Sequence, residues 1–192
     1  ASLSYAVSQS SRGGGSQISQ ERINLMATEM LDYTDLISKS VVQLKLRGCD
    51  SESAADSNKI SFRNTASAAY NHATASDTDC RIFDFNGGGM TFRDAPDNAS
   101  NISPSILFDA NMEVENIGNT CAGVSCSDLL IVFRDIQENL CIRLNEMVNV
   151  TNPVGVPPID TSFNFVPFVG LYTYNGTLGD EATQLDGKKA GC

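Results

Sequence analysis

Histidine and cysteine build many nucleophilic and metal sites, and this sequence offers them in few useful patterns. His72 is the single histidine, and its polar neighbourhood contains neither a nucleophile elbow nor a cysteine-protease signature. A Ser-His-Asp or Cys-His arrangement would have to use it. One histidine also argues against most zinc, copper and non-haem iron sites. The chain has no Cys-x-x-Cys-His motif for haem attachment. We therefore expect no enzyme activity, no haem and no cofactor.

Carboxylates are more numerous and gather in two polar segments. The segments contain Asp50, Glu52 and Asp56, and further on Asp180, Glu181 and Asp186. Calcium takes six to eight hard oxygens from loops, so both segments could hold it, although neither follows the EF-hand spacing. Solvated acidic turns are the simpler interpretation, and only the second segment is kept as a calcium candidate. No pair of carboxylates stands out as glycosidase-like.

The six cysteines favour disulfides over a metal or redox site. No Cys-x-x-Cys pair is present, so neither a thioredoxin-like motif nor a zinc ribbon is supported. Six cysteines allow fifteen connectivities, and reduced cysteines in a cytosolic protein are the alternative. The pairing we expect is Cys49–Cys80, Cys121–Cys126 and Cys141–Cys192.

Length, charge and hydropathy limit the class of protein. A chain of 192 residues with 41% hydrophobic residues can bury the core of one domain. Its net charge of −10 argues against a nucleic-acid partner and against binding to anionic lipid. No run of eighteen apolar residues predicts a membrane span. We therefore expect any membrane anchoring to come only from a segment upstream of Ala1.

The elements that must position these residues begin with a long amphipathic helix, predicted over residues 16–47. Its apolar residues recur at spacings of mostly three or four, as one helix face requires: Ile18, Ile23, Met26, Met30, Ile37, Val41 and Leu44. Ser16 or Ser19 can cap the start, and Gly48 suits a left-handed stop.

Residues 1–15 precede the helix as an arm that the run Gly13–Gly15 decouples from it. If the arm is extended, Leu3, Tyr5 and Val7 share one face, and the arm could add as a strand to the sheet edge of a neighbouring molecule. A flexible terminus and the end of a helix that continues upstream are the alternatives.

Residues 49–192 are predicted to form a β-rich head with a second helix at about 135–149, capped by Asp135. Strands are expected over 59–63, 80–85 with 90–92 as a hairpin, 106–108, 112–114 and 163–174, the last ending in an Asn175-Gly176 turn. The apolar run 129–133 fits either a strand or a helix. The fold class is therefore α+β: a long N-terminal amphipathic helix packed on a disulfide-bonded antiparallel head, with residues 16–192 as one domain.

Several segments resemble uncharacterised bacterial envelope proteins with pilin-like organisation. They are SLSYAV followed by SQSSR and glycines, CRIFDFNGGGMTF, LCIRLNEMV and the closing GKKAGC. The resemblance implies export, and an α-helical spine with a globular β-head similar to type IV pilins and pseudopilins. In such relatives a hydrophobic helix precedes the Ser-Tyr-Ala-Val segment. Ala1–Val7 would then be the stub of a membrane anchor or export signal.

Three functions remain open, and the first is a structural subunit of an extracellular or cell-envelope filament. In that case each chain binds further copies of itself and forms a homopolymer on the cell surface. The second is a monomeric exported binding or adhesion module that contacts a ligand through Asn/Ser-rich loops. The third is a secreted hydrolase that uses carboxylates.

Overall fold

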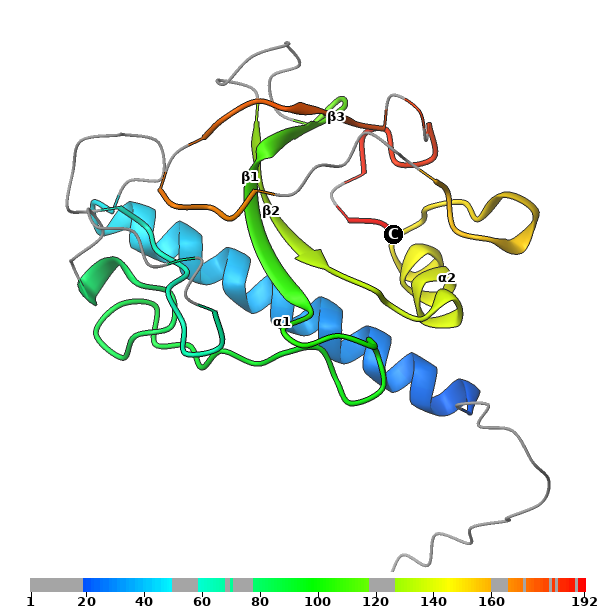
Figure 1. Ribbon diagram of the computed structural model, residues 1–192, viewed down its shortest axis with the longest axis horizontal. Helices are drawn as coiled ribbons and strands as arrows, with labels where there is room; N and C mark the ends of the chain where they lie inside the picture. Colours follow the sequence, from blue (N-terminus) through cyan, green and yellow to red (C-terminus); the bar gives the residue numbers. More distant parts are fainter. Residues whose placement is uncertain are drawn as a thin grey trace, which may run out of the picture.

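The chain folds as two helices and a three-stranded mixed sheet, in the strand order β2-β1-β3 (Figure 1). The computed structural model describes residues 19–49, 59–67, 70, 78–117, 127–159, 166–170, 172–179, 181, 183–188 and 190–192. The predicted α+β class is confirmed. The sheet is not purely antiparallel, however, because β3 runs parallel to β1.

Helix α1, Gln20–Leu46, is the longest element. The Ser19 hydroxyl accepts a hydrogen bond from the Arg22 amide at 3.4 Å and so caps the first turn. Its buried residues follow one face: Ile23, Met26, Ala27, Met30, Tyr33, Ile37, Ser40 and Leu44. Residues 16–18 of the predicted helix lie outside the described residues.

The end of α1 is a Schellman motif. The Gly48 amide donates to the Lys45 carbonyl at 3.0 Å, and the Cys49 amide reaches back to Leu44 at 3.0 Å. Gly48 has φ +93°, a region where a side chain would be strained. Leu44 and Cys49 are both buried in the same apolar cluster, so the chain turns from the helix directly into the core.

The centre of the sheet is β1, Ile106–Val114, which replaces the two short strands expected there. It pairs antiparallel with β2, Asp128–Phe133, so the ambiguous apolar run is a strand. The register shifts between Asp109 and Met112. The Asp109 carboxylate fills this irregularity by accepting the Asn111 amide at 2.7 Å.

The third strand is β3, Gly176–Leu178, and it begins where a turn was predicted. The strand expected over 163–174 is not found in its described part, residues 166–170 and 172–174. That part runs beside β1 through separate hydrogen bonds, such as Phe168 to the Phe108 carbonyl at 2.9 Å. Pro167 has no amide to donate, which interrupts a regular ladder at this point.

Helix α2, Glu138–Met147, starts three residues after the predicted beginning. Asp135 is not its cap but has φ +52° in the preceding turn. Ile136 forms an isolated bridge with Ser100, and the Gln137 amide donates to Ala99 at 3.0 Å. These contacts hold the chain extended until Gln137, which takes the N-cap position although its side chain makes no capping hydrogen bond to the helix.

The predicted hairpin over 80–92 is wrong. The segment forms a short 3-10 helix, Thr78–Cys80, and then a series of turns. The Gly88 backbone lies so close to α1 and to Ile82 that a Cβ there would collide with the Ser40 hydroxyl and would lie 2.6 Å from the Ile82 carbonyl oxygen. The glycines therefore allow a loop to pack on the helix instead of joining two strands.

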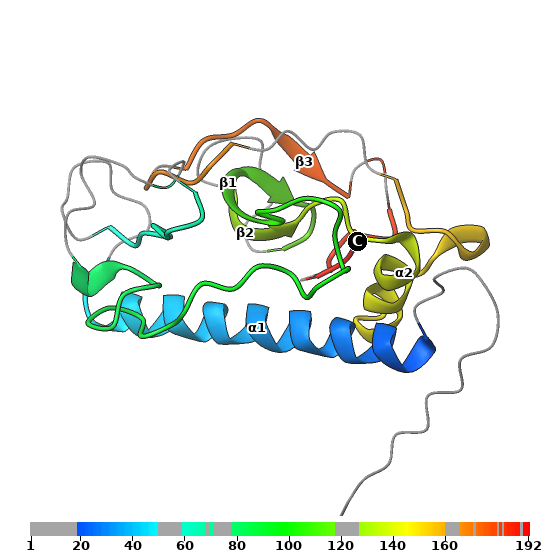
Figure 2. The same ribbon diagram turned by 60° about the horizontal axis from the view of Figure 1, so that its bottom comes forward.

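The sheet and α1 form two layers, with the loop of residues 81–105 running along the helix (Figure 2). The larger core cluster lies between the layers and contains Phe62, whose ring stacks on Phe108 with centroids 4.1 Å apart. The smaller cluster joins the first half of α1 to Leu140 of α2. Both cores therefore rest on the single apolar face of α1.

Candidate functional site

Most of the residues singled out from the sequence lie outside the described residues. These are His72, the arm residues Leu3, Tyr5 and Val7, the pair Cys121 and Cys126, the acidic group Asp50, Glu52 and Asp56, and Asp180. Glu181 and Asp186 of the calcium candidate are described. The Asp186 carboxylate accepts a hydrogen bond from the side-chain amide of Asn116 at 2.6 Å. Among the described residues no three His, Cys, Asp or Glu side chains are grouped as a metal site would require.

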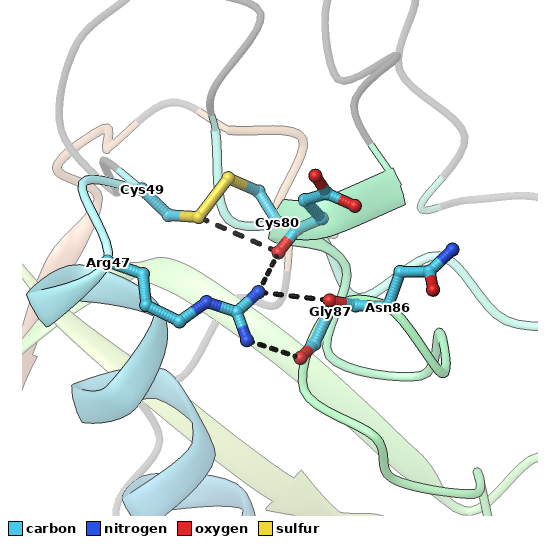
Figure 3. Close-up of a disulfide and its surroundings, with 6 residues drawn as sticks. Arg47, Cys49, Cys80, Asn86 and Gly87 are labelled. Carbon is cyan, nitrogen blue, oxygen red and sulfur yellow. Dashed lines mark hydrogen bonds between the residues drawn. A yellow bond between two sulfur atoms is a disulfide. The ribbon is translucent and has the colours of Figure 1, made fainter.

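Two of the expected disulfides are present. Cys49–Cys80 closes the end of α1 onto the 3-10 helix, with Cα atoms 5.7 Å apart (Figure 3). Cys141–Cys192 joins α2 to the C-terminal segment, with Cα atoms 5.5 Å apart. No described cysteine is free. Disulfides of this kind are typical of proteins that fold in an oxidising compartment.

Arg47 reinforces the first disulfide (Figure 3). Its guanidinium donates to three backbone carbonyls: Asp79 at 2.8 Å, Asn86 at 3.0 Å and Gly87 at 3.1 Å. The Cys49 sulfur lies 3.8 Å from the same Asp79 oxygen, a contact without a proton because a disulfide sulfur carries none. One cation thus joins the end of α1 to three backbone carbonyls of residues 79–87.

Asn145 binds backbone groups of the C-terminal segment, next to the second disulfide. It is fully buried, donates to the Asn152 side chain at 2.8 Å and to the Cys192 carbonyl at 2.9 Å, and accepts the Cys192 amide at 2.6 Å. Together with the disulfide, these bonds fix residues 190–192 beside α2. Nothing in the sequence pattern signals this role, because an asparagine on a helix is usually exposed.

Two carboxylates of the sheet, the buried Asp109 and the half-buried Asp128, accept hydrogen bonds from backbone amides. Asp109 accepts from Asn111 and, at 3.3 Å, from Val166, and burial raises its pKa. Asp128 accepts from Val114 at 2.9 Å, and burial likewise raises its pKa. Because both groups bond to strands of the sheet, they close its irregular points and are not placed as a catalytic pair.

A hollow of about 790 Å³ is an open surface between the loops around Arg63 and Arg81. Phe85 stands at its border and is 94% exposed. Asp84 is the carboxylate that lines it, and that side chain accepts the Asn86 amide at 3.0 Å. This arrangement could contact a ligand, and among the described residues that line it none is a cysteine, a serine or a histidine.

A different feature is the outer edge of β2. Strand β2 lies at the side of the sheet that faces α2 and the C-terminus (Figure 1). The Arg134 amide donates to the Ser105 carbonyl, and in an antiparallel pair every second residue of a strand bonds to its partner strand. The backbone groups of Leu130 and Val132 therefore bond to β1, and those of the residues between and beside them point away from the sheet. Among the described residues none bonds to these outward groups, which belong to Leu129, Ile131 and Phe133.

This edge has no protecting charge within its five apolar residues, Leu129–Phe133. All of β2 is only half-buried. Soluble proteins usually protect such an edge with a lysine, a proline, a bulge or a covering segment. An uncharged and unpaired edge strand is a template for another strand.

A groove borders the edge on each face of the sheet. The outer groove, about 380 Å³, is lined mainly by apolar side chains of the sheet and the C-terminal region, with Lys188 as a charged member; the apolar residues include Val114, Leu130, Val132, Leu178 and Leu185. The inner groove, also about 380 Å³, lies against α1 and is lined there by Met30, Leu31, Thr34, Asp35 and Ser38. Leu144 and Gly191 line both grooves, so the two grooves meet along β2 and share a wall that α2 and the C-terminal segment form.

No protein-family model, curated protein or solved structure matches this chain. Among the described residues, no helix has the length and apolar character needed to cross a bilayer. The free edge of β2 and its two grooves are therefore the features of the described residues that indicate a function.

Proposed function

We propose that this protein is a non-enzymatic structural subunit of an extracellular or cell-envelope filament. The observation that carries the proposal is the outer edge of β2, where an uncharged run of apolar residues has outward backbone groups without partners among the described residues. Polymerisation would cover this edge and both grooves, which is a physical reason for an apolar run at the edge.

The disulfides support the same proposal. Cys49–Cys80 and Cys141–Cys192 hold the two ends of the head onto its helices. A filament outside the cell is diluted and exposed to proteases, and no chaperone refolds its subunits. Disulfides stabilise the folded subunit under these conditions because they constrain its unfolded state. Export to the cell surface is part of the proposal.

The experiment is negative-stain microscopy of the purified full chain over a range of concentrations. We expect fibres from the native protein and far fewer from Val132→Lys, which introduces a charge into the outer groove. Val42→Lys is the matched control, since Val42 is 54% exposed on α1, away from both grooves. Equal melting temperatures would show that the two variants are folded alike.

A second candidate is a monomeric exported binding or adhesion module. The open hollow at Arg63 and Arg81, with the exposed Phe85 ring at its border, is the observation that favours it. Isolated particles at every concentration, together with unchanged behaviour of Val132→Lys, would contradict the filament and favour this candidate. The described carboxylates give no support to a hydrolase.

A further inference from the structure

We infer that the β2 edge is the docking site for the arm of a second copy, with Leu3–Val7 added as a strand between β2 and the C-terminal segment. This inference rests on the proposed function and names the contact by which neighbouring subunits would be joined. Its basis is a strand whose outer edge no described residue covers, with two grooves of different chemistry beside it.

The geometry of a strand fits the two grooves. Successive side chains of a strand point to opposite faces, so one bound alongside β2 would send alternate residues into the outer and the inner groove. The free edge of five residues is about 17 Å long at the usual rise per residue. Leu3–Val7 has the same number of residues and therefore the same length.

The side-chain sizes of the arm also alternate in the required way. Leu3, Tyr5 and Val7 would fill the outer groove, whose walls are Val114, Leu178 and Leu185. The intervening Ser4 and Ala6 are small and would face α1, where Thr34 and Ser38 line the inner groove. No charged side chain occurs before Arg12, so the added strand would bring no charged side chain of its own beside Lys188 of the outer groove and Asp35 of the inner groove.

The linker allows the arm to leave its own molecule. Residues 8–18 contain three consecutive glycines and can span up to roughly 40 Å when extended. That reach would also let the arm bind its own groove, in which case the chain would close its own edge and would not join a neighbour. The test must therefore separate the two geometries.

The test is photo-crosslinking in the full chain with benzoylphenylalanine in place of Tyr5. Equal amounts of unlabelled and nitrogen-15-labelled copies are mixed, irradiated and digested, and mass spectrometry identifies the joined peptides. We expect mixed-label crosslinks to peptides that contain Leu130, Leu178 or Leu185. The same probe in place of Phe85 is the matched control and should not reach these peptides, because Phe85 borders the distant open hollow.

Every outcome decides the question. Crosslinks between differently labelled copies at the outer groove support the inference, whether or not fibres form. Crosslinks only within one label, crosslinks to other surfaces, or no crosslink at all overturn it. Fibres joined elsewhere would leave the filament standing without the arm, whereas groove-linked dimers that never form fibres would leave the arm standing without the filament.

Discussion

Asn145 shows how much one buried polar side chain can hold. Its amide bonds to both backbone groups of Cys192 and to Asn152. We expect Asn145→Ala to lower the free energy of unfolding by about 1–3 kcal/mol, because it leaves buried polar groups without partners. Urea unfolding would measure this change. Asn139→Ala, at an exposed position of the same helix, is the control and should change stability little.

Asp94 predicts a dependence of stability on pH. Burial raises its pKa, but hydrogen bonds from Ser105, Ser103 and Ala95 outweigh this effect, and the net pKa lies below the ordinary value. A carboxylate with a lowered folded-state pKa stabilises the protein above its unfolded-state pKa, near 3.9, and loses that contribution as the pH falls through the folded-state value.

We therefore expect Asp94→Asn to reduce stability at pH 7 and to make the loss of stability below about pH 4 less steep. Urea unfolding at several pH values would measure it, with Asp97→Asn in the same exposed loop as control. An unchanged slope in Asp94→Asn would contradict this role. Asp109 acts in the opposite direction, because its raised pKa makes its contribution fall as the pH rises.

At the scale of elements, the alternation in β2 can be tested with proline. The Ile131 amide points away from β1, so Ile131→Pro removes no hydrogen bond of the sheet, although it loses some packing against the core. Val132→Pro removes a bond to β1 and should be less stable than Ile131→Pro by about 1–3 kcal/mol. Equal losses in urea unfolding would contradict the assigned alternation.

The sequence predicted the class of fold and the approximate position of α2 because these depend on local apolar patterns, whereas the apolar run that forms β2 fitted either a strand or a helix. It could not predict β3, since the parallel pairing of Gly176–Leu178 depends on where β1 lies in space. The hairpin predicted around Gly87–Gly89 is wrong for a similar reason. Glycine permits both a hairpin turn and the close approach to α1 that is found, and only the neighbouring helix decides between them.

The candidate site was predictable only in part. Two cysteine pairs could be expected, but not the residues that support them, Arg47 and Asn145, because side-chain to backbone bonds leave no periodic pattern. Lys59 is a further example: it is only 1% exposed and donates to the Gly170 carbonyl at 2.9 Å. The free edge of β2 follows from the strand order, which no local pattern reveals.

At the scale of the whole molecule, each described disulfide closes a long loop. The sequence separations are 31 and 51 residues. The chain-entropy model gives about 4 kcal/mol of stabilisation for loops of this size. We expect the double variant Cys49→Ser/Cys80→Ser to lose about that amount in urea unfolding. A loss well below about 1 kcal/mol would show that Arg47 and the core hold the end of α1 without the disulfide.

The unequal fastening of α1 has a mechanical consequence. Its last turn is held by the Schellman motif, by Arg47 and by a covalent bond. Its first turn has the Ser19 cap, the buried Ile23 and a contact from Arg22 to the Asp97 carbonyl at 3.4 Å, but no covalent bond. A pull applied through the arm would therefore unwind the helix from Gln20 and stop at Cys49. Because both core clusters rest on α1, the head would lose its core as the helix unwinds, and the Cys49–Cys80 bond would keep the residues between the two cysteines from extending. Optical-tweezer measurements would therefore record a longer extension after the disulfide is reduced.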